Sequence, residues 1–90
     1  MRPLPQFTSK AFLAPMAGVS DPALRLVCKE LGAGLVVTEF TNIHAVIAKQ
    51  AAITEFIEFS PKERPLSVQL FGCNLEALEK AAKIVAPHFE

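Results

Sequence analysis

Three short, largely apolar runs lie along the chain, separated by stretches in which apolar residues recur at helical spacing. The runs cover residues 11–15, 35–38 and 66–71, and the second, Leu35-Val36-Val37-Thr38, is rich in β-branched side chains. Such runs are typical of parallel strands that are covered on both faces. The pattern therefore predicts three strands of a parallel sheet.

A helix is predicted over residues 22–31, between the first two strands. Its apolar positions fall at i, i+3, i+4 and i+7 on one face, at Leu24, Val27, Cys28 and Leu31. This spacing makes Cys28 a small buried side chain and leaves Arg25 on the solvent side. Gly32 is the expected residue after the helix end.

Further helical stretches follow the second and third strands. One starts after a cap at Thr41 or Asn42, and a short one lies within residues 51–59. A polar loop with two prolines covers residues 60–65. The last helix covers residues 75–86 and ends before Pro87. The order β-α-β-α-(α)-β-α indicates an α/β protein with a parallel sheet and right-handed crossovers.

The junction between the first strand and the first helix has strong local signals. Pro15 cannot donate to a sheet ladder, so the strand stops there. Gly18 permits backbone conformations that other residues avoid, Asp21 is a good N-cap, and Pro22 suits the first helical position. Loops of this βα type lie at the carboxyl ends of parallel strands, where α/β proteins bind ligands.

The composition restricts where and how such a protein acts. Nine basic and nine acidic residues give no net charge, which argues against an electrostatic nucleic-acid clamp built from this stretch alone. Two cysteines without metal-type spacing indicate free thiols in a reducing compartment. The apolar run over residues 11–19 is too short to span a bilayer. We expect a soluble cytoplasmic protein without membrane association.

Three segments together resemble the tRNA-dihydrouridine synthases, which are flavin enzymes on a TIM barrel. They are LAPMAGVSD at residues 13–21, LVVTEF at residues 35–40 and ERPLSVQLFG at residues 63–72. The resemblance extends over roughly residues 11–86. It implies that residues 1–90 form the N-terminal β-α-β-α-β-α portion of a (β/α)8 barrel, as one partial domain of three βα units.

A full barrel of this type needs about 250 residues, so we expect the chain to be a fragment of a longer protein. Three strands with their helices leave two edges of the sheet open. These edges predict self-association of the isolated piece. A truncated, non-catalytic half-barrel is therefore one alternative interpretation of the sequence.

The Pro15-Met16-Ala17 segment is the first candidate binding site. Small residues and exposed peptide groups let a flat ring approach, and the following helix start offers unpaired N–H groups to an anion. The resemblance implies FMN contacts at Pro15, Met16 and Ala17. The alternative is an ordinary tight turn in which Met16 fills the core.

Gln69 is the sharpest single candidate, because an amide in an otherwise apolar strand needs hydrogen-bond partners. Its donor and acceptor suit the N3–H and C4=O edge of an isoalloxazine, and the resemblance implies that it contacts the flavin. The alternative is an amide bound to neighbouring backbone or water. Glu39, at the end of the second strand, is either a carboxylate that orients flavin, substrate or a lysine from a later strand, or a solvated or salt-bridged one.

No catalytic residue is assigned within the chain. The family's catalytic cysteine belongs to an Asn-x-Gly-Cys-Pro type of segment after the next strand, beyond residue 90, and Cys73 is expected to be incidental. His44 and His88 have no second ligand at metal spacing, so no metal site is predicted.

The resemblance implies a reaction on tRNA. NADPH reduces bound FMN, hydride passes from N5 to C6 of a uracil base, and a cysteine protonates C5, so that uridine becomes 5,6-dihydrouridine. Because the base must reach the flavin, it has to leave the stack. Another FMN barrel oxidoreductase, such as a dihydroorotate-dehydrogenase-like enzyme, is an alternative that shares Ala-Pro-Met and a glutamine at a strand end.

Overall fold

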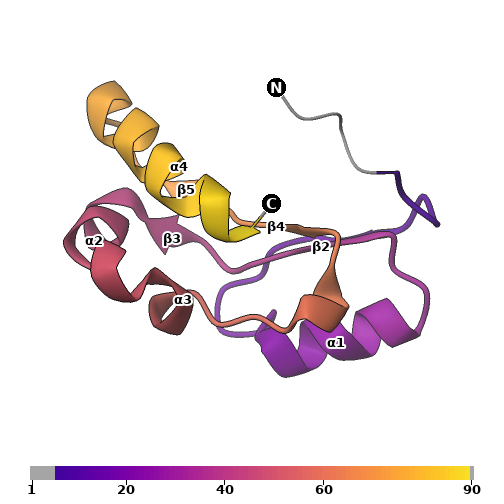
Figure 1. Cartoon of the computed structure of the whole chain (residues 1–90). Helices are drawn as coiled ribbons and strands as arrows, with labels where there is room; N and C mark the ends of the chain where they lie inside the picture. The colour runs from indigo at the N-terminus through magenta and orange to yellow at the C-terminus, as the bar shows by residue number, and fades with distance from the viewer. Residues whose placement is uncertain (1–5, 90) are drawn as a thin grey trace.

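The computed structural model describes residues 6–89 and shows parallel strands connected by helices (Figure 1). One sheet has the order β1-β2-β4, and a separate pair is formed by β3 and β5, with all neighbours parallel. The strands are β1 (Phe12–Leu13), β2 (Leu35–Val37), β3 (Thr41–Asn42), β4 (Leu66–Ser67) and β5 (Leu70–Phe71). The predicted α/β class with parallel strands is confirmed, although the individual strands are shorter than the apolar runs suggested.

The parallel pairing is interrupted at residues 38–40, a segment between the β1-β2-β4 sheet and the β3-β5 pair that we call the bulge. Val37 pairs with Ser67, and the pairing resumes with Thr41 opposite Leu70. Residues 38–40 therefore stand opposite only two residues, so one extra residue is inserted on the first side. The continuous third strand predicted over residues 66–71 is wrong at this point, because the bulge separates β4 from β5.

The helices begin where their capping residues predicted. They are α1 (Pro22–Glu30), α2 (Ile43–Ala48), α3 (Ile53–Phe56) and α4 (Leu75–Phe89), with 3-10 turns η1 (Gln50–Ala52) and η2 (Pro61–Glu63). Asp21 accepts from the Leu24 N–H at 2.8 Å, and Asn74 accepts from the Ala77 N–H at 2.9 Å. The predicted end of the last helix before Pro87 is wrong, since this proline lies in the final turn, where its missing N–H costs a single helical hydrogen bond.

An apolar core lies at the end of the molecule where α2, α3 and α4 meet, while α1 lies at the other end (Figure 1). The buried members of this core come from all three helices and the residue after α3, and they are Ile43, Val46, Ile53, Ile57, Ala81 and Val85. The short helix predicted within residues 51–59 is present as α3. The core thus fixes the helices that follow the second and third strands.

The apolar face predicted for α1 is only partly buried, with Leu24 half-buried and other members exposed. Val27 is 49% exposed and Leu31 is 84% exposed, whereas Arg25, placed on the solvent side from the sequence, is only 3% exposed. Cys28 is half-buried. Helical spacing misjudged this helix because the Arg25 side chain has a buried carboxylate partner, Glu63, far away in the sequence.

Several aromatic side chains remain exposed beside the strands. Phe12 is 50% exposed and contacts Phe7, with ring centroids 4.9 Å apart. Phe40 and Phe71 are 53% and 58% exposed, and their centroids lie 5.5 Å apart. Self-association through the sheet edges stays a prediction, and these rings are apolar surface that it would cover.

Candidate functional site

The segments that follow β1, β2 and β4 are joined by hydrogen bonds at the carboxyl edge of the sheet. The Gly18 N–H donates to Oε1 of Glu39, and the Gln69 N–H donates to Oγ1 of Thr38 at 3.1 Å. Two neighbouring residues of the bulge therefore bind the first βα loop on one side and the third strand on the other. This is the edge at which parallel α/β folds bind ligands.

Hydrogen bonds of the bulge connect the end of β2 to the segment between β4 and β5. The Thr38 hydroxyl, on a residue only 3% exposed, accepts from Gln69 and donates to the Glu39 carbonyl at 3.0 Å. The Thr41 N–H donates to the Gln69 carbonyl at 2.8 Å, where pairing resumes. The Thr38 side chain thus takes the place of a backbone acceptor, and the extra residue turns Glu39 toward the first loop.

The first βα loop is a tight turn around Met16. The N–H groups of Val19 and Ser20 both donate to the Met16 carbonyl at 2.9 Å. Gly18 has φ +76°, a left-handed conformation that suits glycine, and a Cβ placed there would meet nothing within 4 Å. Met16 is 42% exposed and Ala17 is exposed, so the alternative in which Met16 fills the core is wrong.

The four candidate flavin contacts lie on exposed or half-exposed surface. Pro15 is half-buried, while Met16, Ala17 and Gln69 are exposed. Since the Gln69 side chain is exposed, its carboxamide keeps both a donor and an acceptor available for a ligand. Within the described residues, the bulge joins Gln69 to the first loop indirectly, and no hydrogen bond links Gln69 to residues 15–17.

These side chains fit a flat heteroaromatic ring such as the isoalloxazine of FMN. The outer side of the loop has open space at Gly18, and its neighbour Ala17 is small and exposed. The exposed Gln69 carboxamide offers the paired donor and acceptor that an imide edge requires. Assignment of Pro15, Met16, Ala17 and Gln69 to FMN stays a prediction.

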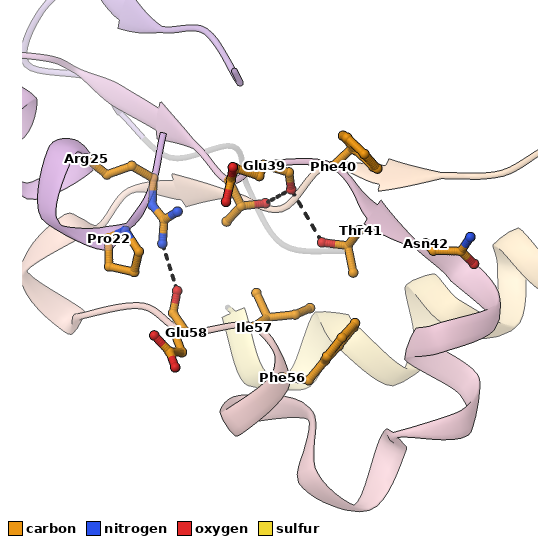
Figure 2. Close-up of a pocket in the computed structure, with 10 residues that line it drawn as sticks. Pro22, Arg25, Glu39, Phe40, Thr41, Asn42, Phe56, Ile57 and Glu58 are labelled. Carbon is orange, nitrogen blue, oxygen red and sulfur yellow. Dashed lines mark hydrogen bonds between the residues drawn. The ribbon is translucent and has the colours of Figure 1, made fainter. Parts of the chain in front are cut away.

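A cavity of about 290 Å³ lies next to this edge (Figure 2). It is lined by Pro22 and Arg25 of α1, by residues 38–42, and by residues 56–58. None of the four candidate flavin contacts lines it, whereas Glu39 does. Glu39 is half-buried and binds the Gly18 N–H, so its role in the fold is to hold the first loop rather than to remain fully solvated.

A buried ion pair beside the cavity was missed from the sequence. Arg25 Nε lies 2.5 Å from Glu63 Oε1, with side chains 3% and 0% exposed. The Arg25 guanidinium also points from α1 to the Glu58 carbonyl, at 2.7 Å (Figure 2). The Ser-x-x-Glu pattern starting at Ser60 could have identified Glu63 as a capping-box residue, which it is. Nothing local identifies Arg25 as its partner.

The cysteines and histidines are the other residues with reactive or metal-ligating side chains, and Cys73 lies two residues after β5. Cys73 is exposed and both cysteines are free thiols. Among residues 6–89, no three His, Cys, Asp or Glu side chains gather in a way that could hold a metal ion. Over the same residues, no helix has the length and apolar character needed to cross a membrane.

Comparison with protein-family models gives a match along most of the chain. The model described as "Dihydrouridine synthase (Dus)" matches residues 12–89. The match includes the first βα loop, the bulge and the third strand, which together make the carboxyl edge described above.

Comparison with curated proteins gives matches to bacterial proteins named as tRNA-dihydrouridine synthases. The chain is 38% identical over 79 residues to "tRNA-dihydrouridine synthase B" of Xanthomonas campestris pv. campestris, covering 88% of the chain and 24% of that protein. It is 32% identical over 77 residues to "Probable tRNA-dihydrouridine synthase" of Aquifex aeolicus, covering 86% of the chain and 24% of that protein. The chain thus spans about a quarter of the length of these relatives.

Proposed function

This chain belongs to the dihydrouridine synthase family, and from that premise we propose that residues 1–90 form the first three βα units of an FMN-binding (β/α)8 barrel. The whole protein would be a cytoplasmic tRNA-dihydrouridine synthase that reduces uridine in tRNA, with NADPH as the reductant. The parallel β1-β2-β4 order and the helical connections support this placement. The family match favours tRNA uridine over the small enone substrate of a dihydroorotate-dehydrogenase-like enzyme.

The observation that carries the proposal is the junction of the first loop, the bulge and the third strand at one edge. Glu39 and Thr38 hold Gly18 and Gln69, so the candidate flavin contacts lie on segments attached to a common support. Such support matters because a binding site must be held close to its productive geometry.

In this proposal the chain positions the flavin and the longer protein completes the site. Pro15, Met16 and Ala17 would line one side of the ring, and the Gln69 carboxamide would bind its imide edge. When bound and reduced, FMN supplies the hydride that saturates the uracil base. These residues orient the ring and shield it from water, and the base has to be unstacked to reach it.

The test uses the complete protein that contains these residues. We expect it to purify with bound flavin and to convert uridine to dihydrouridine in unmodified tRNA when NADPH is supplied. Mass spectrometry of the tRNA nucleosides detects the gain of two hydrogens. A protein that neither binds FMN nor modifies tRNA would overturn the proposal.

Gln69→Leu tests the candidate residue itself. Loss of the paired hydrogen bonds should weaken FMN binding about tenfold, or about 1.4 kcal/mol. Gln50→Leu makes the same chemical change at an exposed position in η1 and should leave the Kd for FMN unchanged. Fluorescence titration of FMN compares the two variants, and equal affinities would remove Gln69 from the site.

A further inference from the structure

A buried chain of polar contacts leads from η2 to α1. Glu63, which is fully buried, binds Arg25 through Oε1 at 2.5 Å and accepts from the Ser60 N–H through Oε2 at 2.6 Å. Arg25 donates from Nη1 to the Ser20 carbonyl at 2.8 Å and from Nη2 to the Glu58 carbonyl at 2.7 Å. Each of the three guanidinium nitrogens of Arg25 and each carboxylate oxygen of Glu63 therefore has a hydrogen-bond partner.

The contacts continue from Ser20 into the first βα loop. The Ser20 hydroxyl accepts from the Met16 N–H at 2.8 Å and donates to the Met16 carbonyl at 3.0 Å. A hydroxyl can do both because it has one donor and two acceptor lone pairs. Ser20 is fully buried, whereas Met16 is 42% exposed. This chain of contacts, Glu63–Arg25–Ser20–Met16, is the relay. It begins in the interior and ends at Met16, an exposed residue of the candidate flavin site.

These contacts are directional in a way that apolar packing is not. The planar guanidinium of Arg25 fixes three acceptors in one fork: the Glu63 carboxylate, the Ser20 carbonyl and the Glu58 carbonyl. Buried ion pairs are weak evidence for stability, since well-packed apolar residues often replace them without loss. The Arg25–Glu63 pair instead orients the turn that precedes α1.

The same turn is held from its other side by the bulge, through the bond from the Gly18 N–H to Glu39. Met16 and Gly18 are therefore each attached to a different part of the fold: Met16 through Ser20 to the start of α1 and η2, and Gly18 to the end of β2. The exposed face between these attachments is the one that carries Ala17.

We propose that Ser20, Arg25 and Glu63 are positioning residues, which hold the Met16 turn in the shape that receives the flavin. The inference rests on the proposed function, because it assigns the turn to FMN. The three residues touch no ligand themselves. They act through the backbone of Met16, and a displacement of that turn changes how the ring is seated.

The test is made in the complete protein with FMN as the probe. Ser20→Ala removes both bonds of the hydroxyl to Met16, keeps the backbone bond between the two residues, and should raise the Kd for FMN about tenfold and shift the visible spectrum of the bound flavin. Ser20→Thr keeps the hydroxyl and should restore both. Ser9→Ala is the matched control, since it also removes a hydroxyl that accepts from the backbone, at Ala11, and it should change neither value.

Hydrogen exchange at the amides of residues 16–18 gives a readout that needs no flavin. Faster exchange in Ser20→Ala than in Ser20→Thr shows that Ser20 holds the Met16 turn even if the wild-type protein binds no FMN. In that case the proposed function and the assignment of the turn to the flavin fail, and the hold on the turn stands. If Ser20→Ala does not fold, Arg25→Lys replaces it, because an ammonium lacks the planar fork that joins Glu63 to the Ser20 carbonyl. Wild-type exchange, affinity and flavin spectrum in a folded variant would overturn the proposal.

Discussion

Around α2 and α4 the buried side chains are mainly apolar, whereas around α1 they include the polar residues Arg25, Ser20 and Glu63 beside Val36 of β2. The apolar end gains stability from surface removed from water, a force without direction. The polar end is held by hydrogen bonds, which act only at particular angles and distances. The turn that carries three of the four candidate flavin contacts, Pro15, Met16 and Ala17, is attached to the polar end. The fourth, Gln69, lies between two residues that pack against the apolar core.

This difference separates two tasks within one small chain. Apolar cores tolerate rearrangement when volume and patterning are kept, so they suit the part of the molecule that only has to stay folded. A charged fork with defined acceptors tolerates much less movement. The polar end therefore suits a loop that has to present backbone groups to a ligand in a single geometry.

The largest expected effect is from breaking the ion pair. Glu63→Leu leaves Arg25 buried without its carboxylate and should lower the free energy of unfolding by about 3–5 kcal/mol, measured by urea denaturation. The double variant Arg25→Met/Glu63→Leu removes both charges and should recover much of that loss. If the double variant is as unstable as Glu63→Leu alone, the cost arises from lost packing and from the lost hydrogen bonds to the neighbouring backbone, and not from an unpaired charge.

A cavity at the apolar end should lower the free energy of unfolding somewhat less than the broken ion pair does, and should change FMN binding little. Ile43 is fully buried between α2 and α4, and Ile43→Ala should lower the free energy of unfolding by about 2–5 kcal/mol. Leu75→Ala, at a position 82% exposed, is the control and should change it by less than about 0.5 kcal/mol. The Kd for FMN of folded Ile43→Ala should rise less than that of Ser20→Ala, because the neighbours of Gln69 pack against this core but the Met16 turn does not depend on it. A larger increase would contradict the separation of tasks.

The smallest effects are expected at the helix starts, because the apolar end and the polar end of the molecule both cap a helix with a side-chain oxygen. Asp21 caps α1 and Asn74 supplies its side chain to the start of α4, so alanine at either position should cost about 1 kcal/mol. Equal losses of the free energy of unfolding in urea denaturation would show that the two ends differ in their buried side chains and not in their helix caps. Asp21→Asn retains a capping oxygen and should behave almost as the wild type.

Local sequence signals predicted the parts of the fold that depend on neighbouring residues. The capping residues Asp21, Asn42 and Asn74 start helices, and Gly18 and Gly32 have positive φ where turns were expected. The three apolar runs contain the strands of the parallel sheet. These features follow from backbone conformations and hydrogen bonds that close within a few residues.

The carboxyl edge was only partly predictable. The first βα loop and the end of the second strand were identified from the order of elements, because the carboxyl ends of parallel strands meet at one edge. The bulge was not, since its extra residue is visible only when residues 38–40 are set against Val68 and Gln69. The same limit applies to Glu39, whose partner is the Gly18 N–H.

The sequence by itself determined the α/β order, the helix starts and the family resemblance that the comparison with known proteins confirmed. Only the tertiary structure decided that Arg25 lies in the interior and that α1 exposes much of its predicted apolar face. The reason is the distance along the chain: Arg25 and Glu63 are separated by 38 residues. A charged side chain is buried only where a partner is brought to it, and helical spacing carries no information about that partner.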